Sequence, residues 1–453
     1  MNTDLVLKNV IVVGTGISGI GAAKLLAEAK AKVCIYDENE KLEYNTVREK
    51  LDNDDRIEIL IGKLDEARIK ETDLLVISPG VPIDSPLVER FKEENIPVWG
   101  EIELAYRFEK GKVAAITGTN GKTTTTTLVG EIIKAYNEKT FVVGNIGNSY
   151  TKEVLKTSED SITVAEISSF QLETVYEFKA KVSAILNITP DHLNRHKTLE
   201  NYAYTKGLIT NKQGKDEICV LNYDDEMLKE FAKQTKASVV FFSRKEKPNV
   251  GAFMQGKDIK YTDGVKEYHI CNVDELKIIG VHNYENVMAA VAIAYNMGVP
   301  FEIISDVVKA FEGVEHRIEY VATKKDVIYY NDSKGTNPDA AVKAIEAMTR
   351  PTILIGGGYD KKLPFDDYVK AFKDTVKLLV LIGETAEQIK ETALKYNFNN
   401  VVIVKDLKEA VEYSAQNAKE GYAVLLSPAC ASWDMFKSYE QRGQLFKEYV
   451  KSL

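Results

Sequence analysis

Short runs of β-branched and aliphatic residues alternate with longer amphipathic stretches along almost the whole chain. The runs are nearly continuous in apolar residues, which is typical of strands buried on both faces of a parallel sheet. Amphipathic stretches such as Gly21–Lys30 and Thr124–Tyr136 predict the intervening helices. The predicted strands are Val10–Val13, Val33–Asp37, Leu74–Ser78, Ala114–Thr117, Phe141–Val143, Thr163–Ile167, Val182–Asn187, Val327–Tyr330, Ile353–Ile355, Leu378–Ile382, Val401–Val404 and Ala423–Leu426. The pattern therefore predicts an α/β fold.

Restarts of this pattern divide the 453 residues into three predicted domains, as a length of about 150 residues per domain also suggests. The strand series begins at Val10, restarts at Ala114 and restarts again at Val327. Residues 1–99 and 314–453 are predicted to be Rossmann-like α/β domains. Residues 100–313 are predicted to form a central α/β domain, in which the polar stretch 245–275 makes a small β excursion.

Composition and charge narrow the functional class. The chain has 59 Lys+Arg against 68 Asp+Glu, a net charge of −9, which argues against nucleic-acid binding and against binding to anionic membranes. The four cysteines form no CxxC pair, so neither a disulfide framework nor a zinc finger is expected. No signal peptide or membrane-spanning run is visible, and we expect a cytoplasmic monomer without membrane insertion.

The first candidate binding loop is Gly14-Thr-Gly16-Ile-Ser-Gly19, which follows a predicted strand and opens a helix. Glycines there allow a tight turn and let backbone N–H groups approach a diphosphate at the helix N-terminus. Asp37 ends the next strand, where an acid that binds a ribose would lie. The loop indicates a dinucleotide or nucleotide-sugar diphosphate site, with a glycine-rich packing turn as the alternative.

The second loop, Thr117-Gly-Thr-Asn-Gly-Lys-Thr123, also links a strand to a helix. Backbone amides of such a loop cradle phosphates, its lysine reaches the terminal phosphates and its threonine hydroxyl can ligate Mg²⁺. The spacing is shorter than the common GxxxxGK[ST] form, but the strand-loop-helix context matches. The sequence therefore predicts an ATP site and a P-loop-type ATPase domain at residues 100–313. The two loops together suggest that ATP acts on a substrate carrying a diphosphate.

Polar side chains lie at the ends of two later predicted strands, Thr163–Ile167 and Val182–Asn187. Glu166 ends one strand, and a run with Asp191 and His192 follows the other. Because the carboxyl ends of parallel strands meet at one edge of a sheet, we expect these groups beside the phosphate loop. Glu166 suits Mg²⁺, and His192 could coordinate or orient a second ion. A salt bridge or a helix cap is the alternative role for Glu166.

A fourth group opens the third domain. His316-Arg317 precedes the polar run 331–337, in which Arg317 could pair with a phosphate and Asp332 could bind ribose or adenine. The alternative is a capped turn before a helix at Asp339–Met348. The later strand-end runs 356–361 and 427–434 are expected to face a cleft shared with the ATP domain.

Taken in order, these runs resemble the Mur ligases of peptidoglycan synthesis over essentially the whole chain. The motifs that carry the resemblance are GTNGKTTTT at 118–126, Glu166, Asp191-His192 with Arg195, His282-Asn283-Tyr-Glu-Asn286 and His316-Arg317. The runs 166–172, 331–337 and 427–432 through 441–443 resemble more narrowly the branch that adds D-glutamate to UDP-N-acetylmuramoyl-L-alanine. The resemblance implies an ATP-dependent amide-bond ligase with an acyl-phosphate intermediate and a part in cell-wall biogenesis, cell shape and cell division.

The resemblance also implies a role for individual residues, with ATP and two Mg²⁺ ions in the central domain. The UDP-substrate would be held by Gly16, Ile17, Ser18, Asp37, Ser78, Gly80, Asn145 and Ser168. ATP would be held by Gly118, Thr119, Asn120, Gly121, Lys122, Thr123, Thr124, Asn283, Asn286, Arg317 and Asp332. The D-glutamate pocket would be lined by Lys334, Thr336, Lys361, Ser432 and Tyr439. The metal ligands would be Thr123, Glu166, His192 and Lys206, the last as a carboxylated lysine, and the catalytic set would be Lys122, Glu166, His192 and Lys206.

Several alternatives stay open at this point. Another Mur-type ligase, or one of the folylpolyglutamate type, would take a different amino acid. An NAD-dependent oxidoreductase leaves the ATP loop unexplained, and a non-catalytic nucleotide-binding regulator would not need Glu166, His192 and Lys206 together. Lys361 and Lys362 follow one another, so either could bind the γ-carboxylate of D-glutamate. We also expect the third domain to close onto the second.

Overall fold

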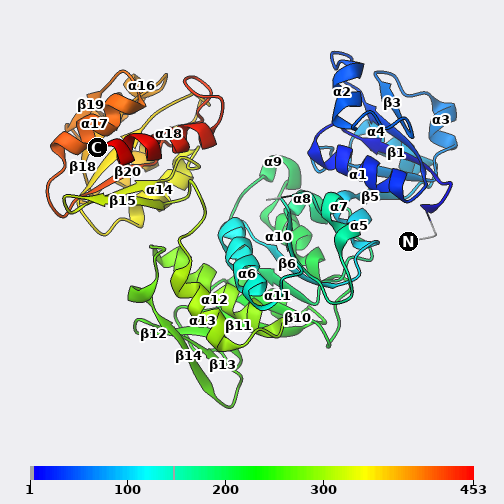
Figure 1. Ribbon diagram of the computed structural model, residues 1–453, viewed down its shortest axis with the longest axis horizontal. Coiled ribbons are helices and arrows are strands. Elements are labelled where there is room, and N and C mark those ends of the chain that lie inside the picture. Colours follow the sequence, from blue (N-terminus) through cyan, green and yellow to red (C-terminus); the bar gives the residue numbers. More distant parts are fainter. Residues whose placement is uncertain (1–4, 146–147) are drawn as a thin grey trace. The chain divides into compact units, whose positions relative to one another are not determined.

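The computed structural model describes residues 5–145 and 148–453, and their strands form three sheets (Figure 1). The chain divides into two compact units, Met1–Val273 with Glu285–Val308, and Asp274–Tyr284 with Lys309–Leu453. The first two sheets lie in the first unit, and the third sheet lies in the second unit. The α/β fold class is confirmed, while the domain boundaries near residues 99 and 313 stay predictions.

The N-terminal sheet is parallel throughout, with the order β3-β2-β1-β4-β5. The strand order reverses between β1 and β4, so the loops that follow these two strands meet at one edge, as in other Rossmann-like sheets. The strands are β1 (Asn9–Val13), β2 (Lys32–Asp37), β3 (Ile57–Ile61), β4 (Leu74–Ile77) and β5 (Val98–Gly100). The helices are α1 (Ile17–Glu28), α2 (Tyr44–Lys50), α3 (Glu66–Lys70), α4 (Pro86–Glu93) and α5 (Glu101–Tyr106).

The central sheet has the order β14-β13-β12-β11-β10-β9-β6-β8-β7. It is parallel from β7 to β12, and β12, β13 and β14 form the expected β excursion with antiparallel pairing. The strands are β6 (Lys112–Thr117), β7 (Thr140–Gly144), β8 (Ile162–Glu166), β9 (Val182–Ile185), β10 (Ile218–Asn222), β11 (Ser238–Ser243), β12 (Gly251–Gln255), β13 (Asp258–Thr262) and β14 (Glu267–Asn272). Because β6 lies between β8 and β9, the loops after these three strands are neighbours.

The helices that follow these strands are mostly short. They are α6 (Lys122–Tyr136), α7 (Tyr150–Glu153), η2 (Val154–Lys156), α8 (Ser169–Leu172), α9 (Leu193–His196), α10 (Leu199–Gly207), η3 (Leu208–Thr210), α11 (Glu226–Ala232) and η4 (Val273–Glu275). Two further helices, α12 (Val281–Asn296) and α13 (Phe301–Ala310), each contribute residues to both compact units.

The third sheet has the order β15-β16-β20-β17-β18-β19 and is parallel except for the edge pair β15 and β16. Its strands are β15 (Glu319–Lys324), β16 (Val327–Asn331), β17 (Thr352–Gly356), β18 (Val376–Leu381), β19 (Val401–Ile403) and β20 (Ala423–Leu426). Its helices are α14 (Pro338–Glu346), α15 (Asp366–Lys370), α16 (Ala386–Lys395), α17 (Leu407–Asn417) and α18 (Tyr439–Ser452). Because β20 lies between β16 and β17, the loops after these three strands lie together.

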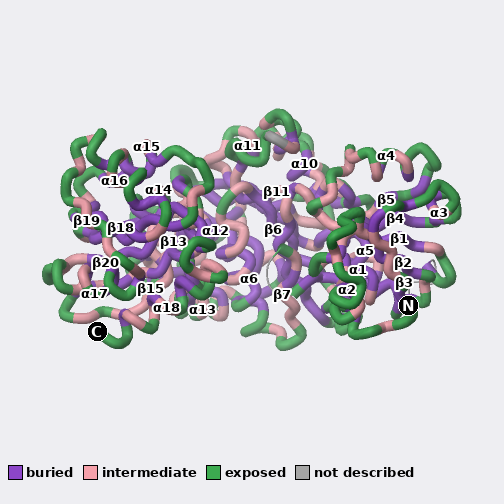
Figure 2. Tube along the Cα trace, turned by 90° about the horizontal axis from the view of Figure 1, so that it is seen from above, coloured by how far each residue is buried: buried purple, intermediate pink, exposed green. Residues whose placement is uncertain are grey.

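The inner strands are buried along their whole length, which explains their continuous apolar sequences. Every residue of β4, β8, β9 and β20 is buried. Helices α2, α3 and α16 have many exposed residues (Figure 2). Each Val, Leu or Ile side chain buried in this way contributes about 1.5–3 kcal/mol to folding. No helix in the described part of the chain is long and apolar enough to cross a bilayer.

Two expectations from the hydrophobic pattern need correction. Helix α1 begins at Ile17 and not at Gly21, because the glycine-rich loop leads directly into the helix with Gly16 as its N-cap. The third sheet begins before Val327 with the antiparallel edge strand β15, whose residues are half-buried or exposed and so lack a continuous apolar run. Strands β3, β10 and β11 were also not predicted from the pattern.

Candidate active site

The loop after β6 has the backbone conformation that a phosphate-binding loop needs. Gly118 and Gly121 have φ values of +154° and +82°, and a Cβ atom at Gly121 would collide with Asn286 Oδ1. The loop after β9 supports it, because the Asn120 amide donates to Asn187 Oδ1 at 2.8 Å. Helix α6 starts directly afterwards at Lys122, so its N-terminal amides lie at the loop. This arrangement can bind the phosphates of a nucleotide.

Two lysine amines converge on one carbonyl of this loop. Lys122 Nζ donates to Gly118 O at 2.8 Å and to Thr119 O at 2.9 Å, and Lys206 Nζ donates to the same Gly118 O at 2.8 Å. Lys206 is only 1% exposed and its amine lies 4.5 Å from the centre of the Tyr202 ring. Burial, with help from the nearby Lys122 charge, lowers the pKa of Lys206 to about 6. A pKa of about 6 leaves most Lys206 amines unprotonated at pH 7, and its 1% exposure places Lys206 in the interior and not on the surface of the helix.

Glu166 lies at the end of β8, beside the phosphate-loop strand, and is 1% exposed. Its Oε1 accepts a hydrogen bond from Asn145 Nδ2 at 2.9 Å. Its Oε2 is buried without a hydrogen-bond partner among the described residues, and so is Thr117 Oγ1 at the end of β6. A buried carboxylate oxygen without a donor is costly unless an ion binds it. Because carboxylate and hydroxyl oxygens are the ligands that Mg²⁺ prefers, these residues fit a magnesium ion.

His192 lies in the loop after β9, as expected, with a left-handed φ of 52°. About half of its side chain is exposed, with Nε2 3.6 Å from Asp191 Oδ2. Its ring centre lies 4.8 Å from that of Phe170. The ring is thus held by neighbours and keeps an exposed edge, and its part in metal binding stays a prediction.

In the N-terminal sheet, the loops after β1 and β4 come together as predicted. A Cβ atom at Gly14 would clash with Ser78, so the close approach of the two loops requires glycine there, and a Cβ atom at Gly19 would clash with the backbone carbonyl of Gly14 within the first loop. Asp37 Oδ2 accepts hydrogen bonds from the Thr15 amide at 3.2 Å and hydroxyl at 2.9 Å. Asp37 therefore stabilises the first loop from the end of β2.

The remaining residues predicted for the UDP-substrate lie at the edge of this loop or in the central sheet. The side chain of Ile17 is 84% exposed, and Gly16 and Gly80 each leave open space where a side chain would be. Ser168 caps α8 and forms a capping box with Gln171. Asn145 is joined to Glu166, so it lies at the candidate metal site and not in the N-terminal loops.

In the second unit, a buried carboxyl group joins the segment after β16 (331–337) to the segment after β20 (427–434). Asp332 is 4% exposed, and its Oδ2 accepts a hydrogen bond from Ser427 Oγ at 2.7 Å. Burial raises the pKa of Asp332 to about 7, although the Ser427 hydrogen bond and the Arg317 charge oppose the shift. Arg317 itself is exposed.

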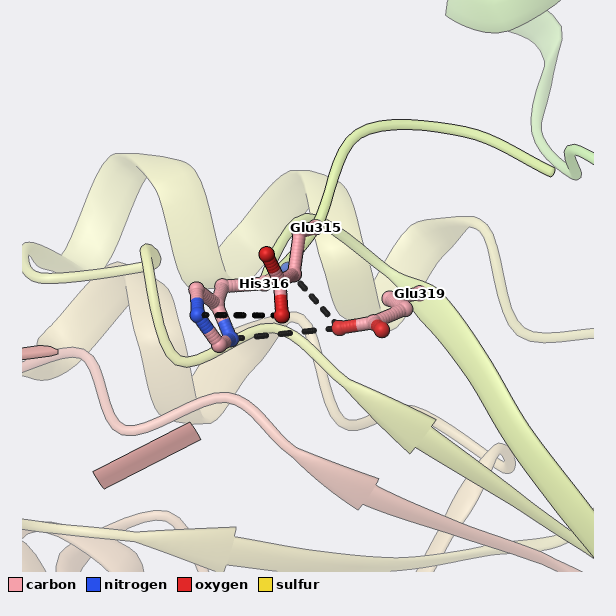
Figure 3. A group of neighbouring side chains, drawn as sticks. All are labelled: Glu315, His316 and Glu319. Atoms are coloured by element: carbon pink, nitrogen blue, oxygen red, sulfur yellow. Dashed lines mark hydrogen bonds and ion pairs between the residues drawn. The ribbon is translucent and has the colours of Figure 1, made fainter. Parts of the chain in front are cut away.

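The His316-Arg317 turn is fixed by an ion-pair group, drawn in Figure 3 without its lysine. Glu319 Oε2 accepts hydrogen bonds from the His316 amide and from Asn331 Nδ2, both at 2.9 Å. Lys447 pairs with Glu315 and lies 3.0 Å from Glu319 Oε1. Lys447 pairs with both carboxylates, and Glu319 also binds the backbone of the turn, so the group is a structural support for the turn.

The residues predicted for D-glutamate lie on the loops after β16, β17 and β20 and at the start of α18. Lys361 Nζ donates to Thr336 O at 3.3 Å and lies 5.5 Å from the centre of the Trp433 ring. Lys362 instead pairs with Asp360 of its own loop. In the same unit, Lys334 Nζ lies 5.8 Å from the centre of the Tyr439 ring, and Ser432 is buried.

The two asparagines predicted for the nucleotide lie in different compact units. Asn286 Oδ1 accepts a hydrogen bond from Thr125 at 3.3 Å, on the helix that follows the phosphate loop. Asn283 Nδ2 donates to Ile279 O at 2.7 Å in the other unit. Asn286 is therefore joined to the phosphate-loop helix.

Arg442 is a supporting residue that sequence reasoning missed. It is 1% exposed, and its guanidinium donates to Ser333 Oγ at 3.0 Å, Ser333 O at 2.8 Å, Cys430 O at 3.1 Å and Ala431 O at 3.3 Å. It thus ties the run after β16 to the run after β20. A signal was present in the sequence, because Arg442 is in helical phase with the buried Phe446 and Val450 and so occupies a core position.

Comparisons with known proteins agree with this arrangement along the chain. Three family models match: the Mur ligase MurD-like N-terminal domain at residues 8–100, the Mur ligase middle domain at 116–294 and the Mur ligase glutamate ligase domain at 316–430. A relative from Lachnospira eligens, named UDP-N-acetylmuramoylalanine–D-glutamate ligase, is 64% identical and covers 99% of this chain and 100% of its own length. A relative of the same name from Clostridioides difficile is 46% identical with the same two coverages.

Solved structures share the fold at low sequence identity. The UDP-N-acetylmuramate–alanine ligase of Thermotoga maritima has a TM-score of 0.60 at 19% identity, over 98% of this chain and 99% of its own. The MurF ligase of the same organism, in complex with ADP, has a TM-score of 0.58 at 15% identity, over 100% and 97%. At these identities the likeness supports the fold alone.

The depressed pKa of Lys206 predicts a specific pH dependence of stability. In the unfolded chain a lysine has a pKa of about 10.4, so between pH 6 and pH 10 the unfolded state binds one proton more than the folded state. The unfolding free energy of the wild type should therefore rise with pH by about 1.4 kcal/mol per unit relative to Lys206→Met. Urea titrations of both proteins at pH 7, 8 and 9 in CO₂-free buffer measure this difference.

Lys212→Met is the matched control for this comparison, because Lys212 is an exposed lysine that pairs with Glu177 at 2.8 Å. The unfolding free energy of Lys212→Met should change with pH by the same amount as that of the wild type over this pH range. If the unfolding free energy of Lys206→Met showed the same pH dependence as that of the wild type, Lys206 would be charged in the folded protein and the interpretation would be wrong.

Proposed function

This chain belongs to the Mur ligase family, and on that premise we propose that it joins D-glutamate to UDP-N-acetylmuramoyl-L-alanine with consumption of ATP. The observation that carries the proposal is the phosphate loop at 118–121, with the amines of Lys122 and of the buried Lys206 on one carbonyl. Relatives that bear the name of this ligase, at 64% and 46% identity over nearly the whole chain, support the choice of substrates.

The proposed reaction has two steps. The alanyl carboxylate is a poor acyl donor, so one of its oxygens first attacks the γ-phosphorus of ATP, and ADP leaves with the bonding electron pair. The amine of D-glutamate then attacks the acyl carbon of this acyl phosphate. The new C–N bond forms as the C–O bond breaks, phosphate leaves, and the amine proton passes to solvent. No side chain needs to form a covalent bond to the substrate.

The chain contributes charge and position to the first step. Lys122 is at the loop that would cradle the phosphates and supplies a positive charge where the transferring group becomes more negative. Thr123 follows at the N-terminus of α6 and offers a hydroxyl group to the same region. Holding the reactants in an oriented geometry supplies several kcal/mol of the barrier reduction.

The lowered pKa of Lys206 favours the unprotonated amine, which is the form that can react with CO₂. Its neutral nitrogen would attack the carbon of CO₂, the N–C bond would form, and the ammonium proton would pass to water, which leaves an anionic carbamate. The charge of this site would then change from neutral to −1 beside the Lys122 cation. The carbamate, together with Glu166 and with His192 from the next loop, would hold Mg²⁺. Magnesium bound there would neutralise charge on the phosphoryl group.

The remaining residues are assigned to parts of the substrates according to the loops on which they lie. Gly16, Ile17, Ser18, Asp37, Ser78 and Gly80 would contact the UDP group, while Asn145 and Ser168 would lie toward the reacting end. The nucleotide would be held by Asn283, Asn286, Arg317 and Asp332. Cytoplasmic location, a monomeric state and closure of the third domain remain predictions.

The experiment that tests the function measures phosphate release from ATP with UDP-N-acetylmuramoyl-L-alanine present. D-glutamate should support turnover at least about a hundredfold faster than L-alanine or meso-diaminopimelate, because a site that binds a γ-carboxylate leaves buried polar groups unpaired with the wrong substrate. Mass spectrometry of the product should show the dipeptide on the UDP-sugar.

Omission of the UDP-substrate is the control for uncoupled ATPase activity. Equal turnover with L-alanine or meso-diaminopimelate would reassign the amino acid within the family. Phosphate release that did not depend on any amino acid would contradict the ligase itself.

The γ-carboxylate of D-glutamate is expected to bind Lys361 and not Lys362, because Lys362 is already paired with Asp360. Lys361→Ala should raise the KM for D-glutamate by about tenfold or more, which corresponds to one charge-assisted hydrogen bond. Lys362→Ala, at the next position, is the matched control and should change the KM for D-glutamate by less than about threefold. Steady-state kinetics at saturating ATP and UDP-substrate measure both values, and the opposite ranking would exchange the two roles.

A further inference from the structure

Arg195, at the end of the loop that carries His192, reaches from the central sheet to a turn of the N-terminal sheet. Its Nη1 donates to Pro79 O at 3.1 Å and its Nη2 donates to Val81 O at 3.2 Å. The same guanidinium forms a two-point ion pair with Glu173 and lies 4.4 Å from the centre of the Phe170 ring. The side chains of Arg195 and Glu173 are 15% and 9% exposed. Arg195 therefore holds backbone carbonyls of one domain with a side chain anchored in the other.

The anchor of Arg195 is continuous with the predicted catalytic loop. The Arg195 amide donates to His192 O at 3.0 Å, and both residues pack on the ring of Phe170. The next residue, His196, shares a hydrogen bond of 3.0 Å with Ser169. A displacement of the Arg195 side chain would therefore be passed to His192 through one turn of backbone and one shared aromatic ring.

A second, independent connection also joins the N-terminal and central sheets. Gln171 Nε2 donates to Glu101 Oε1 at 2.6 Å, while Gln171 Oε1 accepts hydrogen bonds from the Ser168 amide and hydroxyl. Glu101 directly follows β5 of the N-terminal sheet, and Ser168 lies between β8 of the central sheet and α8. The buried side chains of Glu101 and Gln171 thus join the end of β5 to Ser168.

From these contacts we infer that Arg195 is a positioning residue, which fixes the distance between the turn 78–81 and the loop that carries His192. The inference rests on the proposed function, in which the turn holds the UDP end of the substrate and the loop lies at its reacting carboxylate. A substrate held at both ends reacts fast only when the two contact regions keep a fixed separation. Binding of UDP alone uses one end and does not need that separation.

The test compares Arg195→Lys with the wild type in three measurements. A lysine keeps the charge but cannot bond to Glu173 and two carbonyls at once or stack flat on Phe170. We expect kcat for phosphate release to fall about tenfold, while the Kd of UDP measured by calorimetry changes less than threefold. We also expect amide hydrogen exchange of the peptide containing Val81 to accelerate at least fivefold without substrate.

Arg107→Lys is the matched control, because Arg107 pairs with the buried Glu103 at 2.7 Å and lies 4.7 Å from the centre of the Trp99 ring. Like Arg195, it pairs with a largely buried glutamate and lies near an aromatic ring, but it bonds to neither the turn nor the loop, so all three measurements should stay within twofold of the wild type.

Three results would overturn the inference. They are an unchanged kcat for Arg195→Lys, a UDP Kd weakened as much as kcat falls, and equal acceleration of exchange at Val81 in Arg107→Lys. If the wild type itself released no phosphate with D-glutamate, the proposed function would fail, and the hydrogen exchange would still decide whether Arg195 fixes the turn.

Discussion

One backbone carbonyl, Gly118 O, accepts hydrogen bonds from the amines of both Lys122 and Lys206, and the rest of the site depends on this contact. Burial of Lys206, together with the nearby charge of Lys122, lowers the pKa of Lys206 to about 6. The unprotonated amine is the form that can take up CO₂. With a carbamate on Lys206, as proposed, the site would be cationic at the phosphates and anionic at the metal.

The sheet topology brings the partners of this contact together. In the central sheet β6 lies between β8 and β9, which brings Glu166 and the His192 loop to either side of the phosphate loop. In the N-terminal sheet the order reverses between β1 and β4, which joins the glycine-rich loop to the turn after β4. Arg195 connects the two sheets at this point. Local binding loops of this kind let an acidic protein hold phosphorylated substrates despite a net charge of −9.

Features tied to local sequence could be predicted, and features that depend on packing could not. The buried strands and the phosphate loop were predicted because an apolar run and a glycine pattern are read within a few residues. The burial of Lys206 was not, because nothing in its neighbourhood indicates which face of α10 packs on Gly118. Glu101 and Arg442 were assigned no role for the same reason, since their partners Gln171 and Ser333 lie 70 and 109 residues away in the sequence. The family resemblance supplied Lys206 where spacing did not.

The most direct test of this account asks whether Lys206 carries a carbamate. The protein is equilibrated with ¹³C-bicarbonate at neutral pH, and its carbon NMR spectrum is compared with that of Lys206→Arg, whose guanidinium stays protonated. The account predicts a protein-bound carbamate resonance in the wild type that is absent from the variant and disappears when CO₂ is removed. An active wild type without that resonance, or the same resonance in Lys206→Arg, would contradict it.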